Sequence, residues 1–185
     1  IDRMLQSARR TSEFQNLLAG DTALLCMNLR YIGAMMVVVR SLVAGLNLIV
    51  RPASGHPLSD IEEPLRFAAM VPLQVYNTLR VPEEKARLEQ TDILIIGGGA
   101  VDDSLEAEMS ALPTAVYSTY GMTETLSHIA LRRLHGATAA KHYYPFPSVE
   151  LSLSAESTLV IKAPLICGEV LQTNDIACLY PDGSF

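Results

Sequence analysis

Apolar positions in the first part of the chain form short continuous runs separated by segments of helical pattern. Residues 2–18 carry apolar side chains among polar ones at helical spacing, and Thr22–Met27 is an apolar run typical of a buried strand. Ile32–Ala44 predicts a buried helix that ends at Gly45, and Leu46–Val50 predicts the next strand. The pattern therefore predicts a strand–helix–strand unit.

This alternation continues as far as residue 117. The Pro, Gly and Ser residues of Arg51–Pro57 indicate a loop. The elements expected after it are, in chain order, a helix from about Ser59 to Phe67, the apolar run Ala68–Val71, a helix over Leu73–Leu79, a strand over Ile93–Ile96, a helix reaching Ser110 with Asp103 and Glu106 as its capping box, and a strand over Thr114–Tyr117. Alternating strands and helices of this kind predict an α/β fold whose mostly parallel sheet carries helices on both faces.

Past residue 144 the chain changes to alternation with a period of two. Residues 149–153 alternate apolar and polar side chains, and short apolar runs follow at Leu159–Ile161 and Ile176–Tyr180. We expect antiparallel strands in this part. Residues 1–144 would then form an α/β core and residues 145–185 a β-rich segment.

The end of the sequence has the composition of a tight turn. Pro181–Ser184 reads PDGS, and Phe185 would open a returning strand that the sequence does not contain. We therefore expect the β-rich segment to be truncated and the natural chain to be longer.

Composition narrows the partners and the compartment. The chain has 185 residues, is 49% hydrophobic and carries a formal charge of −6 without a basic run, so neither nucleic acid nor an anionic membrane surface is an expected partner. Its longest apolar run, Ile32–Val39, is much shorter than the about 20 residues that cross a bilayer. The three cysteines, Cys26, Cys167 and Cys178, are odd in number, lie in apolar surroundings and show no C-x-x-C spacing. These features are typical of reduced thiols in a cytoplasmic protein. The oligomeric state stays open, with a homo-oligomer as one option.

The segment Tyr117–Ser127, with the sequence YSTYGMTETLS, is the strongest candidate for a functional site. It follows a predicted strand, and open α/β sheets bind ligands at the carboxyl ends of their strands. In this segment Tyr120 offers a flat ring for a purine, Gly121 allows close approach of the backbone, Thr123 can donate to a phosphate oxygen, and Glu124 is a hard oxygen ligand for Mg²⁺. The alternative is a solvated turn in which Thr123 caps a helix and Glu124 lies in its first turn.

Three consecutive glycines, Gly97, Gly98 and Gly99, follow the predicted strand Ile93–Ile96. A dinucleotide-binding fingerprint would need a further glycine at position 102, where Asp102 stands with other acidic residues that would repel a pyrophosphate. A structural turn is therefore the leading interpretation from the residues alone.

Five blocks of the sequence, in this order, resemble the adenylate-forming superfamily of acyl-CoA synthetases, adenylation domains and luciferases. These blocks are residues 25–50, VPLQVYNTL at 71–79, ILIIGGGA at 93–100, YGMTE at 120–124 and TND at 173–175. The resemblance covers roughly residues 22–185. Among the branches of the superfamily, the chain most resembles the o-succinylbenzoate–CoA ligases of menaquinone biosynthesis. The resemblance lies in the segments FAAMVPLQVYNTL, GMTETLSHIALRRL and TNDIACLYPDGSF.

The resemblance implies a fragment of the large N-terminal domain of an AMP-forming acid–CoA ligase. Such an enzyme uses ATP, Mg²⁺, coenzyme A and a small-molecule carboxylate, and it forms an acyl-adenylate before the thioester. The implied roles are catalysis by Thr123 and Glu124, Mg²⁺ binding by Glu124, nucleotide binding by Gly97, Gly98, Gly99, Tyr120, Gly121 and Asp175, and substrate binding by Tyr31 and Gly33. Tyr31 would either line the acyl pocket or cap the core.

Two elements that the superfamily requires have no counterpart in this sequence. These are a Ser/Thr/Gly-rich phosphate loop ending in Lys and a second Lys on a mobile lid, since Lys85, Lys141 and Lys162 stand in other contexts. We expect this chain alone to be inactive. The alternative is a non-catalytic nucleotide-binding or interaction module derived from the same fold. Arg30, Arg40 and Arg51 could each pair with a substrate carboxylate, and the alternative for each is a structural or surface arginine. Arg30 and Arg40 are the candidates for a second carboxylate of the substrate.

Overall fold

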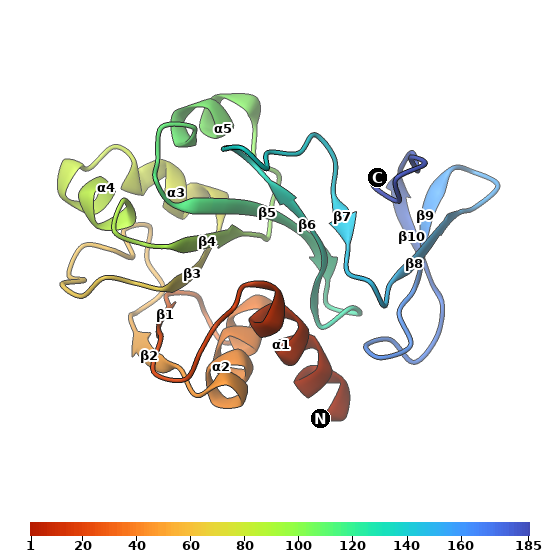
Figure 1. Ribbon diagram of the computed structural model, residues 1–185, viewed down its shortest axis with the longest axis horizontal. Coiled ribbons are helices and arrows are strands. Elements are labelled where there is room, and N and C mark those ends of the chain that lie inside the picture. The colour runs from red at the N-terminus through yellow and green to blue at the C-terminus, as the bar shows by residue number, and fades with distance from the viewer.

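The computed structural model describes residues 1–185 as five helices and ten strands (Figure 1). The helices are α1 (Asp2–Phe14), α2 (Ile32–Ala44), α3 (Pro72–Thr78), α4 (Pro82–Leu88) and α5 (Asp103–Met109). The strands are β1 (Thr22–Leu25), β2 (Asn47–Val50), β3 (Phe67–Met70), β4 (Ile93–Ile96), β5 (Ala115–Met122), β6 (Ser127–Arg133), β7 (Tyr144–Pro145), β8 (Glu150–Leu153), β9 (Thr158–Lys162) and β10 (Leu171–Ile176). No helix is both long enough and apolar enough to cross a membrane.

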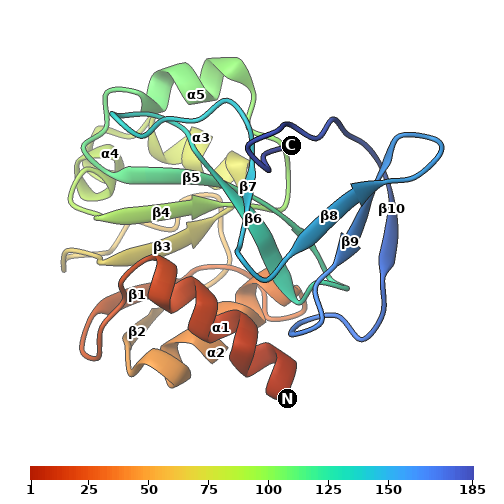
Figure 2. The same ribbon diagram turned by 45° about the vertical axis from the view of Figure 1, so that its right-hand side comes forward.

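The strands form two sheets, and this confirms the predicted fold class. The larger sheet has the order β2-β1-β3-β4-β5-β6-β7, in which β2 through β5 are parallel and β6 and β7 are added antiparallel. Helices α1 and α2 cover one face of this sheet, and α3, α4 and α5 cover the other (Figures 1 and 2). The smaller sheet, β10-β9-β8, is antiparallel.

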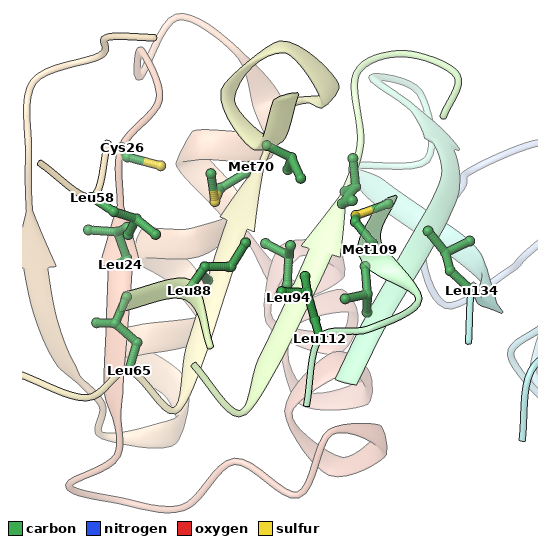
Figure 3. Packing of buried hydrophobic residues seen from close by; sticks show 14 of the residues in the cluster. Leu24, Cys26, Leu58, Leu65, Met70, Leu88, Leu94, Met109, Leu112 and Leu134 are labelled. Atoms are coloured by element: carbon green, nitrogen blue, oxygen red, sulfur yellow. The ribbon is translucent and has the colours of Figure 1, made fainter. Parts of the chain in front are cut away.

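Each face of the large sheet has its own hydrophobic core, because successive side chains of a strand point to opposite faces. On β4, Leu94 and Ile96 pack in the core beneath α3, α4 and α5, and Figure 3 shows Leu94 among those side chains. Ile93 and Ile95 pack on the opposite face against residues of α2. A strand that is buried on both faces must be apolar throughout, which explains why Ile93–Ile96 was predicted with the bounds that it has.

A third cluster joins the two sheets. Ile129 and Leu131 of β6 pack against Leu159 and Ile161 of β9. The small sheet is therefore attached beside the antiparallel end of the large one (Figure 2). The division of the chain at residues 144 and 145 stays a prediction, and the short strand β7 lies across it.

The helix expected from Ser59 to Phe67 is wrong. Residues 59–66 form turns and loop, and Phe67 is the first residue of β3. Pro64 lacks the backbone N–H that a helix interior requires, and its carbonyl instead accepts a hydrogen bond from the hydroxyl of Thr22 at 2.8 Å. The apolar residues of this loop, such as Ile61, fill the core beside the helices.

Two other expectations need correction, and one helix was missed. The helix cap of α5 is Asp102 rather than Asp103, because the Asp102 carboxylate accepts the N–H of Leu105 at 2.8 Å. The run Ile176–Tyr180 is not a strand, since β10 ends where the run begins. Helix α4 was not predicted, although Val81 and the following proline mark its start.

Leu94→Ala should lower the free energy of unfolding by about 2–5 kcal/mol, because it leaves a cavity beneath the helices. Leu42 on α2 is the matched control: it is 79% exposed, and Leu42→Ala should change the same quantity by less than about 0.5 kcal/mol. Urea unfolding followed by circular dichroism measures both. Equal losses for the two variants would contradict the assignment of the core.

Candidate functional site

The carboxyl ends of β3, β4 and β5 come together at one edge of the large sheet. Thr119 on β5 donates a hydrogen bond from its hydroxyl to the carbonyl of Ile96, the last residue of β4, at 3.0 Å. A Cβ atom at Gly97 would lie 2.6 Å from that same hydroxyl, so any other residue would have to displace Thr119 from this hydrogen bond. Gly98 has φ of +77°, and it lies against Val71 at the end of β3. The glycine loop thus packs directly between its two neighbouring strands.

Strand β5 is longer than its sequence suggested. It runs to Met122, so Tyr120 and Gly121 are strand residues rather than loop residues. Only residues 123–126 form the turn, and β6 starts at Ser127. Because no helix follows, the alternative in which Thr123 caps a helix is wrong. The segment is instead the tip of the β5–β6 hairpin.

The hairpin has a β-bulge at Gly121. Tyr120 pairs with Ala130 and Gly121 with His128, which leaves Ile129 as the extra residue on β6. A side chain at Gly121 would lie 2.2 Å from the carbonyl oxygen of Ser127. The close contact between β5 and β6 therefore requires glycine at position 121, independently of the predicted role of Gly121 in nucleotide binding.

Thr125 holds the turn in shape. Its hydroxyl oxygen accepts the N–H of Met122 at 2.9 Å, and the hydroxyl donates to the carbonyl of Ser127 at 2.6 Å. The thiol of Cys167 lies 3.6 Å from the carbonyl oxygen of Glu124, so the turn is also held from the loop after β9. Thr123 and Glu124 themselves are exposed, and neither side chain has a hydrogen-bond or ion-pair partner. Both side chains are free to contact a ligand.

The structure brings Tyr120 and Asp175 together from different sheets. The Tyr120 hydroxyl donates to Asp175 Oδ2 at 2.5 Å. The Tyr120 ring lies 5.1 Å from the ring of Phe185 and 6.1 Å from that of Tyr143, between centroids. Burial, followed by the hydrogen bond and the negative charge of Asp175, raises the pKa of Tyr120. The phenol therefore stays protonated and is a donor.

Tyr31 and Gly33 lie after the carboxyl end of β1, at the start of α2. Tyr31 immediately precedes α2 and is 70% exposed, so it does not cap the core. Gly33 is the second residue of α2, and nothing lies within 4 Å of the position that its side chain would take. No hydrogen bond joins either residue to the hairpin. Their assignment to substrate binding stays a prediction.

Arg40 of α2 connects that helix to the hairpin. Its side chain is 1% exposed, and its Nη2 donates to the hydroxyl of Ser127 at 2.7 Å. Its Nε is buried without a hydrogen-bond partner, and no carboxylate pairs with the guanidinium. Burial lowers the pKa of Arg40 to about 10, so the group is still charged at neutral pH. Arg40 is a buried cation with no anion beside it.

His128 lies next to this cation and was not among the predicted site residues. Its Nε2 is 3.1 Å from the hydroxyl of Thr11 on α1, and its Nδ1 is 3.2 Å from the hydroxyl of Ser127. Burial, and then the charge of Arg40, lowers the pKa of His128 well below 6.5, so the imidazole is neutral. The sequence does mark Arg40, because it is the single charged residue of an otherwise apolar helix. No feature of the sequence indicates that His128 is buried.

The predicted Mg²⁺ ligand Glu124 is a single carboxylate and not part of a cluster of protein ligands. No group of three or more His, Cys, Asp or Glu side chains gathers anywhere in the chain to hold a metal ion. Glu124, exposed and unpaired, is suited to the way that Mg²⁺ binds with substrate phosphates, through one or two carboxylates and retained waters.

A family model described as "AMP-binding enzyme" matches residues 2–172. The chain therefore belongs to the AMP-binding enzyme family.

Among solved structures, the chain is similar to an acyl-CoA synthetase (AMP-forming)/AMP-acid ligase II-like protein from Dyadobacter fermentans. The identity is 30% and the TM-score 0.92 over 99% of this chain and 52% of that one. It also has the fold of the o-succinylbenzoate coenzyme A synthetase of Bacillus subtilis, solved with ATP and magnesium ion, with 18% identity and a TM-score of 0.80 over 100% of this chain and 44% of the other.

Among curated proteins, a probable 2-succinylbenzoate–CoA ligase of Mycobacterium tuberculosis is 28% identical over 61% of this chain and 36% of its own length. The chain thus spans about a third of that relative and about half of the solved structures that it matches.

Gly121→Ala should lower the free energy of unfolding by about 1–3 kcal/mol, because the added methyl group overlaps the carbonyl of Ser127. Gly33→Ala is the control, since that position is open and helical, and it should be neutral or stabilising by up to about 1 kcal/mol. Thermal unfolding of both variants compares them. A stable Gly121→Ala protein would contradict the close pairing of β5 and β6.

Proposed function

We propose that the protein to which this chain belongs is an AMP-forming acid–CoA ligase whose acid is o-succinylbenzoate. Membership of the AMP-binding enzyme family supports the class of reaction. The names of the Mycobacterium and Bacillus relatives support the acid, and so does the resemblance of residues 67–79 and 121–134 to that branch. The reaction has two halves: a carboxylate attacks the α-phosphate of ATP to release pyrophosphate, and the thiol of coenzyme A then displaces AMP.

In this proposal the hairpin tip binds the phosphates, and the hydrogen-bonded residues Tyr120 and Asp175 bind the nucleoside. The Thr123 hydroxyl donates to an α-phosphate oxygen, and the free carboxylate of Glu124 is a ligand of Mg²⁺, which would neutralise phosphate charge when bound. The Tyr120 ring lies against adenine, and the ionised Asp175 accepts hydrogen bonds from the ribose hydroxyls. Gly97, Gly98 and Gly99 form the backbone wall of the site, because their lack of side chains leaves peptide groups accessible.

The burial of the Arg40 guanidinium without a carboxylate partner is the observation that supports o-succinylbenzoate as the acid. A second carboxylate distinguishes o-succinylbenzoate from benzoate and from fatty acids, and such a group needs a cationic or strongly donating partner in an otherwise apolar pocket. Arg40 is a buried guanidinium with an unused Nε donor and no carboxylate partner, and Ser127 connects it to the hairpin. A substrate carboxylate there would supply the missing anion and replace or share the Ser127 contact. Arg30, the other candidate, is exposed at the surface.

The full-length enzyme should prefer o-succinylbenzoate over benzoate by at least about tenfold in kcat/KM, which corresponds to about 1.4 kcal/mol of differential transition-state binding. Arg40→Met should reduce that preference by about tenfold or more while adenylation of benzoate persists, because only the dicarboxylate uses the guanidinium. Pyrophosphate release measures both activities, with medium-chain fatty acids as further substrates.

Arg30→Met is the matched control and should leave the preference unchanged, since Arg30 is exposed. Equal losses toward both acids in Arg40→Met would show that Arg40 only supports the fold. A wild-type preference for a fatty acid would contradict the proposed substrate while the ligase class stands. The absence of pyrophosphate release with every acid would favour a non-catalytic module.

A further inference from the structure

We propose that the Tyr120 hydroxyl competes with the nucleotide for Asp175, so that the hydrogen bond between these two side chains sets the affinity of the site. The inference rests on the proposed function, because it takes Asp175 as the acceptor for ribose. Its direct basis is the 2.5 Å contact between the Tyr120 hydroxyl and Asp175 Oδ2. We refer to this contact below as the Tyr120–Asp175 bond.

The bond joins the two sheets of the molecule. Tyr120 lies on β5 of the large sheet and Asp175 on β10 of the small one, 55 residues later in the chain. Strand β10 is irregular between Gln172 and Ile176, so the register that would fix Asp175 opposite a partner on β9 is interrupted there.

The Tyr120 ring is held on its own side by an aromatic cluster. Phe185 and Tyr143 exchange two backbone hydrogen bonds, at 2.9 and 3.0 Å, and both rings contact Tyr120. The hydroxyl of Tyr143 is instead hydrogen-bonded to that of Ser118 at 2.7 Å. The Tyr120 hydroxyl is therefore the group of this cluster that is directed at β10.

The carboxylate is also held through its backbone. The N–H of Asp175 donates to the Thr173 hydroxyl at 3.1 Å, and that hydroxyl donates to the carbonyl of Leu159 at 2.9 Å. Two adjacent ribose hydroxyls are best accepted by both oxygens of one carboxylate, and here Oδ2 already accepts from Tyr120. In this proposal, full engagement of a ribose requires the Tyr120–Asp175 bond to open.

The size of the effect follows from the fraction of molecules in which the bond is open. A site that binds its ligand only in an open state has its apparent affinity reduced by the open fraction. Asp175 is exposed, so water competes for it and the bond is partly open without ligand. Tyr120→Phe keeps the ring and removes the competing donor, and it should tighten AMP binding about three- to tenfold.

The test is calorimetric titration of the full-length protein with AMP. Tyr120→Phe should lower the Kd about three- to tenfold. Tyr143→Phe is the matched control: it removes a hydroxyl from the neighbouring ring, one bonded to Ser118, and should leave the Kd unchanged. AMP should also produce a tyrosine ultraviolet difference spectrum in the wild type and in Tyr143→Phe, and this signal should be lost in Tyr120→Phe.

Asp175→Ala separates the inference from the proposed function. If it weakens AMP binding about tenfold or more while Tyr120→Phe binds no more tightly than the wild type, the competition is refuted and the ribose assignment stands. If Asp175→Ala binds AMP like the wild type, both the ribose assignment and the inference fall. A wild-type protein that binds AMP without any tyrosine difference signal would also overturn the inference, even if the Tyr120→Phe variant failed to fold.

Discussion

The close pairing of β5 with β6 at Gly121 is the contact on which the candidate site depends. At this point the parallel sheet becomes antiparallel, and the two backbones approach so closely that a methyl group would overlap the Ser127 carbonyl. The bulge and the hydroxyl of Thr125 then shape a four-residue turn that leaves Thr123 and Glu124 exposed. The same pairing carries Tyr120 toward the small sheet, where it meets Asp175. Thr123 and Glu124 are thus positioned by backbone geometry, whereas Tyr120 and Asp175 also hold each other through a hydrogen bond.

A buried cation lies behind this hairpin. Removing a guanidinium from water costs several kcal/mol unless a partner compensates, and Arg40 has only the hydroxyl of Ser127. The neighbouring His128 stays neutral because burial lowers its pKa and the charges of Arg40 and Arg10 lower it further. A buried cation without a carboxylate partner contributes little to stability, and in the proposed function this cation is the partner of the second substrate carboxylate.

Much of the fold could be predicted from local pattern. Helix α2 has its predicted bounds because an apolar run closed by Gly45 in the left-handed conformation is a local signal. Residues 59–66 misled the prediction because loop residues such as Ile61 are as apolar as those of a helix when they fill a core. Proline at position 64 was the signal that should have argued against that helix.

The site was less predictable than the fold, because its geometry arises from contacts between distant segments. Pattern alone ended β5 near Tyr117, whereas pairing with β6 extends it to Met122. The meeting of Tyr120 with Asp175 depends on how the small sheet docks, and no local signal reports that. Arg40 could be named as a candidate, but its burial against Ser127 could be learned only from the packing of α2 on the hairpin.

In the proposed function the hairpin tip acts on the phosphates of ATP through Glu124. The most direct measurement is ATP–pyrophosphate exchange by the full-length protein over a range of Mg²⁺ concentrations, with wild type, Glu124→Gln and Glu156→Gln. Glu156 is an exposed carboxylate in the turn before β9 and is the matched control. Glu124→Gln should reduce Mg²⁺-dependent exchange by at least about tenfold, since even groups one contact removed from a metal commonly matter by about 10- to 100-fold, and Glu156→Gln should match the wild type. Wild-type exchange by Glu124→Gln would contradict the account.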